Sequence, residues 1–395
     1  MRFDQAVQLL LKHKADLNRG ISNDGAPHIY HAAARGHWAV VELLLTVRAA
    51  VNRSTANGST AVHVAAQKGH LQLTKLLIAS AADVNTGKLD GSATPVFSAA
   101  REGQVKTLEA LIQAEADVHM ATRDVGALPL IVAAQMGHSK VLKVLIRAGS
   151  HVNKARNDGA TPICMAAQAG HSLVLELLVQ ARADFNESLT DNTSPLFLAA
   201  QEGHWEAVEF LVWSRADVNA ARTDGSTALF ASARLNSKHV LMLLLSARAD
   251  VDKVRNDDAS TAVHVAVQGC QEQVLAHLIA ARARVNGAGG YTNATPLFLA
   301  AQHGRDGLLR LLISAKAGLN GAIKDGTTPV YAAASAGHDG CLQQLIMAKA
   351  ETSKANAEDD MTPIGIALRL GHLSSVELLM GAGESIEGVH CFLFG

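Results

Sequence analysis

Histidine is the residue type in this chain with the greatest potential for chemistry. The sequence contains 18 histidines among 395 residues, and the imidazole group can act as a general base or as a metal ligand near neutral pH. Seven of them directly follow a glycine, and the intervals between them are made of steps of 33 or 34 residues. These seven, called here the histidine column, are His37, His70, His138, His171, His204, His338 and His372.

The spacing of the histidine column argues against a metal site. If each repeat forms a helical unit, neighbouring units lie about 8 to 10 Å apart. A zinc ion binds nitrogen at roughly 2 Å, so imidazoles from neighbouring units cannot share one ion. We therefore predict a structural role for the column, with hydrogen bonds at the loops between helices.

Other patterns for catalysis are weak. The sequence has no G-x-S-x-G nucleophile motif and no phosphate-binding loop. The glycine-rich segment 287–290 lacks a helix N-terminus directly after it, and Cys164 and Cys341 fall at helical positions typical of small core residues. We expect no enzymatic activity, no catalytic residues, no cofactor and no metal.

The elements that organise the chain are short helices in pairs. In the clearest copy, residues 191–219, Ser194 can cap a helix and Pro195 suits its first position. Gly203 ends that helix after about two turns, and a leucine-rich second helix follows through Leu211. The copy therefore predicts a helical hairpin.

This hairpin recurs along the whole chain at intervals of 33 or 34 residues. The position of Pro195 is repeated as His28, Ala61, Pro95, Pro129, Pro162, Ala228, Ala262, Pro296, Pro329 and Pro363. The position of Leu211 is repeated as Leu10, Leu44, Leu77, Leu111, Leu145, Leu178, Leu244, Leu278, Leu312, Leu345 and Leu379. Such periodicity predicts one extended array of stacked units.

The repeated unit resembles the ankyrin repeat. The family pattern of Asp-Gly-x-Thr-Pro, Ala-Ala and Gly-His is matched in residues 158–171. The resemblance implies an all-α solenoid of stacked helical hairpins with short β-hairpin fingers. It divides the chain into an incomplete N-terminal repeat at 1–20, repeats 1 to 11 at 21–386 and a C-terminal tail at 387–395.

The resemblance implies a non-catalytic scaffold or adaptor that binds a protein along its concave groove and fingers. In the family, the variable binding positions follow Ala-Ala and lie in the fingers. The candidate partner-binding residues are Arg35, Gln67, Lys68, Arg101, Gln135, Gln168, Gln201, Glu202, Arg234, Gln268, Tyr291 and Gln302. The alternative for the glutamines among them is that Gln is merely a good exposed helix former.

Composition limits the classes of partner and the cellular locations to be expected. A formal net charge of −1 and a pI near 7 give no global attraction for nucleic acid, and no apolar run approaches the roughly 20 residues that span a membrane. The four cysteines are far apart, as in proteins of a reducing compartment. We expect a cytoplasmic protein, with a nuclear location left open. We also expect a monomer that can pair at its uncapped N-terminal end.

Two further roles are open. The array can be the targeting or regulatory portion of a larger enzyme, channel or ubiquitin-ligase substrate receptor. The resemblance also implies that Val-Asn residues such as Asn186 and Asn219 can be substrates of an asparagine hydroxylase.

Departures from the family pattern give additional predictions. The glycine expected after each second helix is mostly replaced, at Lys14, Arg48, Ala81, Glu115, Arg182, Arg215, Arg248, Arg282, Lys316 and Lys349. The cations among them form either a structural row of helix-end charges or a basic ribbon for an acidic partner.

Three other groups have predicted positions. The finger arginines, defined as Arg123, Arg156, Arg222 and Arg255, are expected to pair with neighbouring aspartates. The aromatic residues Tyr30, Phe97, Phe197, Phe230, Phe298 and Tyr331 are expected in the core. The three tryptophans, Trp38, Trp205 and Trp213, are expected to be partly packed supports.

Overall fold

The structure is a computed structural model that describes residues 25–88, 93–290, 293–358 and 360–385. The predicted incomplete repeat at 1–20, the candidate residue Tyr291 and the predicted tail lie outside the described residues.

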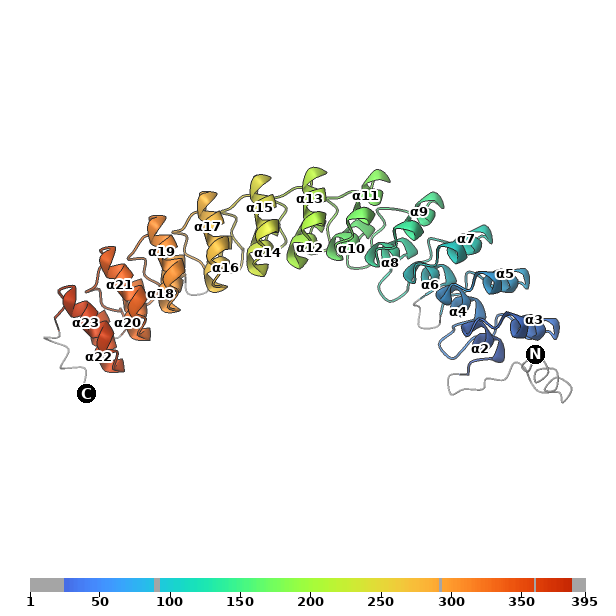
Figure 1. Ribbon diagram of the computed structural model, residues 1–395, viewed down its shortest axis with the longest axis horizontal. Helices are drawn as coiled ribbons and strands as arrows, with labels where there is room; N and C mark the ends of the chain where they lie inside the picture. Colours follow the sequence, from blue (N-terminus) through green and yellow to red (C-terminus); the bar gives the residue numbers. More distant parts are fainter. Residues whose placement is uncertain (1–24, 89–92, 291–292, 359, 386–395) are drawn as a thin grey trace. The chain divides into compact units, whose positions relative to one another are not determined.

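The described residues form twenty-two helices in eleven pairs, and the prediction of an all-α repeat array is confirmed (Figure 1). The first helices of the pairs are α2 (His28–Ala34), α4 (Ala61–Lys68), α6 (Pro95–Arg101), α8 (Pro129–Gln135), α10 (Pro162–Gln168), α12 (Pro195–Glu202), α14 (Ala228–Leu235), α16 (Ala262–Gln268), α18 (Pro296–Gln302), α20 (Pro329–Ala336) and α22 (Pro363–Leu370). The second helices are α3 (Trp38–Thr46), α5 (Leu71–Ala79), α7 (Val105–Gln113), α9 (Ser139–Arg147), α11 (Ser172–Gln180), α13 (Trp205–Trp213), α15 (Lys238–Ser246), α17 (Glu272–Ala280), α19 (Asp306–Ser314), α21 (Asp339–Met347) and α23 (Leu373–Gly381).

The chain divides within α12 into two compact units, one up to Ala199 and one from Ala200 onward. In the first unit, first helices pack side by side in the order α2, α4, α6, α8 and α10, and the second helices form their own row (Figure 1). In the second unit, the first helices from α14 to α22 and the second helices from α13 to α23 are arranged in the same two rows. Each unit is therefore two helical layers thick.

Caps and small residues define the first helix of each pair. Thr94 Oγ1 accepts the backbone N–H of Phe97 at 3.2 Å, and Pro95 occupies the first helical position. Ala99 and Ala100 are fully buried, so the adjacent helix can approach closely. In the second helices, every described member of the Leu211 column is at most 2 % exposed. The core thus lies between neighbouring hairpins, as the periodicity predicts.

The second helices end in left-handed backbone even where glycine is absent. Nine non-glycine residues at this position have φ between 61° and 68°: Arg48, Ala81, Glu115, Arg182, Arg215, Arg248, Arg282, Lys316 and Lys349. A side chain in this conformation costs roughly 1 kcal/mol. A cation near a helix C-terminus returns about 0.3 to 1 kcal/mol, whereas an anion there adds to the cost.

Glu115→Gly is therefore expected to raise the free energy of unfolding by about 1 kcal/mol. The change removes the left-handed strain and the unfavourable charge at the end of α7, and the greater freedom of glycine in the unfolded chain offsets part of the gain. Urea denaturation measures the difference. Arg182→Gly is the matched control and should gain less, because it also removes a favourable cation. Equal gains would contradict the charge contribution.

Aromatic burial agrees with expectation except at Tyr30 and at one tryptophan. Phe97, Phe197, Phe230, Phe298 and Tyr331 are at most 8 % exposed, and Tyr30 is half-buried against the ring of His31. This confirms core packing for five of the six.

The expectation that Trp213 is a packed support is wrong, because its side chain is 86 % exposed. It lies two residues after the buried Leu211, which places it on the opposite side of α13. Trp38 and Trp205, at the starts of their helices, are 44 % and 46 % exposed and agree with partial packing.

Candidate partner-binding surface

The positions after Ala-Ala form rows at the C-terminal ends of the first helices. In the first unit the row contains Gln67, Arg101, Gln135 and Gln168, and in the second unit it contains Gln201, Arg234, Gln268 and Gln302. All eight are exposed or half-exposed, as are the flanking candidates Arg35, Lys68 and Glu202. The structure therefore brings the sequence-predicted candidates, Tyr291 aside, into two exposed rows, one in each unit.

The histidine column holds the backbone of these rows. Nε2 of His171 lies 3.1 Å from the carbonyl oxygen of Gln135, and Nε2 of His338 lies 3.2 Å from that of Gln302. Because a carbonyl can only accept, the imidazole must carry its proton on Nε2 and donate it. His138 contacts the carbonyl of Arg101 in the same way, at 3.0 Å. These bonds support the predicted structural role.

The same histidines explain the glycines beneath them. Gly137 has φ +72°, and a Cβ atom there would lie 2.7 Å from Cε1 of His171. Gly304 has φ +64°, and a Cβ would lie 2.7 Å from Nδ1 of His338. Glycine is thus required both for left-handed backbone and for close approach of the imidazole from the next repeat.

The side chains of the rows differ in their own pairing. Gln67 donates to Glu102 at 3.5 Å, and Gln201 donates to Glu202 at 3.3 Å. The side-chain amides of Gln135, Gln268 and Gln302, in contrast, make no hydrogen bond within the part of the chain that the structure describes. These three amides keep both donors and acceptors for another molecule.

Hydrogen bonds between successive repeats also fix the fingers. The N–H of Asn157 donates to the carbonyl of Val125 at 2.9 Å, and the N–H of Asn256 donates to that of Asp224 at 2.8 Å. Equivalent bonds join Thr190 to Asp158, Gly290 to Asp258 and Ala357 to Asp325. The fingers concerned are therefore bound to their neighbours by their backbones.

A column of asparagines, which sequence reasoning considered only as modification sites, adds a third connection. Oδ1 of Asn85 accepts the backbone N–H of Asp117 at 2.8 Å, and Oδ1 of Asn219 accepts that of Asp250 at 2.7 Å. The recurrence of asparagine at the end of Ala-Asp-Val-Asn was the signal for this contact.

The finger arginines are paired at three of four positions, as predicted. Arg156 makes a bidentate contact with Asp158 at 2.6 and 2.8 Å, and this hydrogen bonding lowers the pKa of the Asp158 carboxyl. Arg222 lies 3.6 Å from Asp224. Arg255 pairs with Asp257 and also stacks on the Phe230 ring, 5.6 Å from its centroid.

The expected pairing of Arg123 is wrong. Within the described residues, its guanidinium makes no ion pair or hydrogen bond. In the fingers of Arg156, Arg222 and Arg255, the paired aspartate lies two residues after the arginine. Two residues after Arg123 the sequence has Val125 instead. The adjacent Asp124 lies one residue too early. The missing aspartate was visible in the sequence and would have indicated an unpaired cation.

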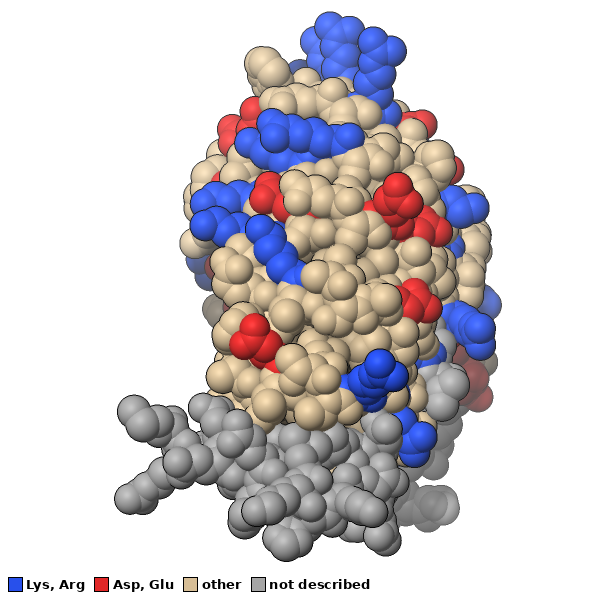
Figure 2. Space-filling model, turned by 90° about the vertical axis from the view of Figure 1, so that its right-hand side faces the viewer, with Lys and Arg blue, Asp and Glu red and all other residues tan. Residues whose placement is uncertain are grey.

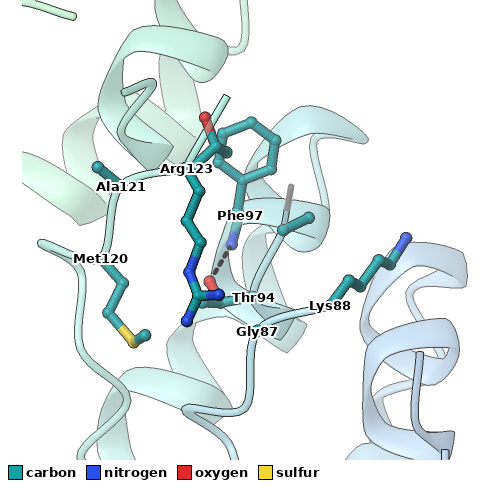
Figure 3. Close-up of a pocket in the computed structure, with 9 residues that line it drawn as sticks. Gly87, Lys88, Thr94, Phe97, Met120, Ala121 and Arg123 are labelled. Atoms are coloured by element: carbon teal, nitrogen blue, oxygen red, sulfur yellow. Dashed lines mark hydrogen bonds between the residues drawn. The ribbon is translucent and has the colours of Figure 1, made fainter. Parts of the chain in front are cut away.

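Arg123 borders a small cavity between two fingers of the first unit. The cavity has a volume of about 100 Å³, and its walls include Phe97 from α6, Lys88 from the preceding finger and Met120 (Figure 3). Small-molecule sites generally have volumes of about 300 to 1,000 Å³. The cavity is therefore of a size for one side chain rather than for a cofactor.

His63 and His264 are buried and belong to the fold. Nδ1 of His63 lies 3.2 Å from the backbone nitrogen of Thr60, and Nε2 lies 3.1 Å from the carbonyl oxygen of Ala93. Burial first, and then the charge of Lys88, lower the pKa of His63 to about 4. The imidazole is consequently neutral at pH 7.

The described residues carry charges of both signs, and their helices are short. On the face shown in Figure 2, Lys and Arg side chains are interspersed with Asp and Glu side chains over a largely uncharged surface. Among the described residues, no helix has the length and apolar character that crossing a bilayer requires. The described residues also contain no group of three or more His, Cys, Asp or Glu side chains that could hold a metal ion.

Helices stacked in rows and joined by recurring columns of hydrogen bonds define a helical repeat protein. A model of the family described as "Ankyrin repeats (3 copies)" matches the chain in overlapping segments at residues 2–88, 29–124, 72–156, 96–189, 130–222, 196–288, 229–323 and 297–388. The chain belongs to the ankyrin repeat family. Ankyrin repeats are generally protein–protein interaction modules and are typically non-catalytic. No curated protein sequence matches the chain at a significant level.

Proposed function

We propose that this protein is a non-catalytic scaffold that binds a partner protein along the first-helix ends and the fingers. The observation that supports the proposal best is that the side-chain amides of Gln135, Gln268 and Gln302 have no hydrogen-bond partner among the described residues. Imidazoles hold the backbone carbonyls of Gln135 and Gln302 while the side chains of these residues remain available, and an ordered site loses less conformational entropy on binding than a mobile one.

The chemistry of these rows suits an extended polypeptide. A glutamine amide offers two donors and an acceptor, which match the backbone carbonyls and N–H groups of a peptide. Each row repeats its polar positions once per repeat, so successive contacts along a peptide can use the same chemistry. Nearby Arg234 adds a charge that selects among sequences.

A triple variant, Gln135→Ala, Gln268→Ala and Gln302→Ala, is expected to lose most of the proteins that the full chain captures from a cell extract. The substitutions remove the three free amides and leave the helices intact, because alanine is the best helix former. Quantitative mass spectrometry of the captured proteins is the measurement.

The matched control replaces three glutamines on second helices, Gln113, Gln180 and Gln273, with alanine. It changes composition equally and should leave the captured set unchanged. The proposal is contradicted when both variants capture the same proteins in the same amounts as the unaltered chain.

A further inference from the structure

We propose that Arg123 binds an acidic side chain of the partner polypeptide, with the adjacent cavity receiving an apolar group next to it. This inference rests on the proposed protein-binding function and assigns part of the partner's chemistry. It concerns one finger of the first unit and is independent of the row of cations at the helix ends.

The difference between Arg123 and the other finger arginines carries the argument. Arg156 and Arg222 each have an aspartate of their own finger within 4 Å, which neutralises their charge. Each of those aspartates lies two residues after its arginine. Two residues after Arg123 lies Val125, whose side chain is 44 % exposed. The exposed Arg123 guanidinium therefore has five N–H donors, none of which finds an acceptor among the described residues.

The finger of Arg123 is bonded to its neighbour, and the two cations beside the cavity point in different directions. Its finger is tied to the next one by two contacts, one of which is the 3.3 Å hydrogen bond from Asn157 Nδ2 to the carbonyl of Asp124. In Figure 3 the Arg123 side chain extends past Phe97 with its guanidinium near Met120, whereas Lys88 points away from it. Arg123 thus provides the direct contact, and Lys88 adds a second positive charge at a distance.

Charge complementarity selects a carboxylate as the occupant. Two cations, Lys88 and Arg123, border the cavity, and neither forms an ion pair within the described part of the chain. A guanidinium and a carboxylate can form two parallel hydrogen bonds, which gives both strength and orientation. Met120 and Phe97 provide apolar walls of the cavity, and the exposed Val125 lies two residues after Arg123 in the same finger.

A peptide fits this site better than a nucleic acid does. Nucleic acids are held by many cations along a backbone and by exposed aromatic rings that stack on bases. Here the cations are two, and the ring of Phe97 is only 8 % exposed. An isolated guanidinium beside apolar groups matches an acidic residue followed by an apolar one.

The test uses the full chain and a bead-displayed library of random nonapeptides. Sequencing of the captured beads gives, at each peptide position, the enrichment of Glu and Asp over Gln and Asn. The unaltered chain is expected to show an enrichment on the order of tenfold at one position, the factor typical of one strong charge-assisted hydrogen bond. Circular dichroism confirms that each variant is folded.

Three variants make the test specific. Arg123→Ala should abolish the acidic enrichment, and Val125→Asp should abolish it too, because an aspartate at this offset pairs with Arg123 as Asp158 pairs with Arg156. Val125→Asn is the control: it has the same shape without the charge and should keep the enrichment.

The outcomes separate this inference from the proposed function. Peptide capture with equal acidic enrichment in the unaltered chain and in Arg123→Ala overturns the inference alone. Capture of no peptide by any form overturns both. If a uridine dodecamer displaces the captured peptides and Glu and Gln peptides bind equally, the acidic-peptide assignment is wrong and phosphate recognition replaces it.

Discussion

Lowering the pH from 7 to 4 is expected to cost this protein about 3 kcal/mol of stability through His63 alone. Burial and the nearby Lys88 lower the pKa of this imidazole from 6.5 to about 4 in the folded chain. Each unit of pKa difference corresponds to about 1.4 kcal/mol, so the shift amounts to about 3 kcal/mol.

Stability falls with decreasing pH because the proton binds more tightly to the unfolded chain than to the folded chain. Between pH 6.5 and 4 the unfolded chain takes up a proton that the folded chain refuses, so stability is complete above pH 6.5 and falls as the pH approaches 4. Protonation of Nδ1 would also remove the acceptor of the Thr60 N–H. Carboxylates act in another window: the lowered pKa of Asp83 and of Asp158 means that their contribution is lost only below about pH 4.

His63→Phe is the variant that isolates this effect. Phenylalanine occupies the same repeat position at Phe97, and the carbonyl of Ala93 still accepts the N–H of Lys88 at 3.2 Å. Urea denaturation at pH 7, 5.5 and 4 should show a shallower dependence on pH in the variant. The exposed His239, replaced by glutamine, serves as the control for the removal of a histidine as such. Identical slopes for the unaltered chain and His63→Phe would contradict the assignment.

Gly137→Ala is expected to reduce the free energy of unfolding by about 2 to 3 kcal/mol. About 1 kcal/mol comes from placing a side chain at φ +72°. The remainder comes from the imidazole of His171, which must move away from the new Cβ and lose its hydrogen bond to the carbonyl of Gln135, at about 1 to 2 kcal/mol.

Gly149 in the same repeat separates the two contributions. Its φ is +85°, and a Cβ there would have nothing within 4 Å, so Gly149→Ala has the backbone cost without the collision. The two variants should differ by about 1 to 2 kcal/mol in urea denaturation. In a Gly137→Ala chain that also carries His171→Ala, the collision disappears. Equal losses for the two single variants would mean that the histidine contact contributes nothing.

Most of the fold could be predicted because a repeated unit exposes its rules many times. Three features recur in successive copies: proline at the first helical position, the Ala-Ala pair and a leucine in every second helix. Each recurrence indicates the same local structure again. The left-handed geometry at Arg182 and its counterparts was predictable for the same reason, since the position is marked by glycine at Gly149.

The candidate site was less predictable because it depends on departures from the repeat. The pairing of Arg123 fails because the aspartate of its finger, Asp124, stands one residue too early, a departure that is visible in the sequence only when the fingers are compared with one another. Trp213 was misjudged because the hairpin pattern defines which face of α13 is buried but does not say that a large aromatic side chain remains on the other face. Tyr291 stays a prediction, since it lies outside the described residues.

The three connections between successive repeats have a consequence for how such a chain can change its length. Three kinds of hydrogen bond join successive repeats: from histidine to a backbone carbonyl, from a backbone N–H to asparagine, and between the backbones of adjacent fingers. Equivalent positions make these bonds at many junctions. Loss or duplication of one whole repeat in the gene joins surfaces that already match, with no new complementarity to evolve. Insertions of any other size put unrelated residues opposite each other, so the array can grow or shrink readily only in whole steps.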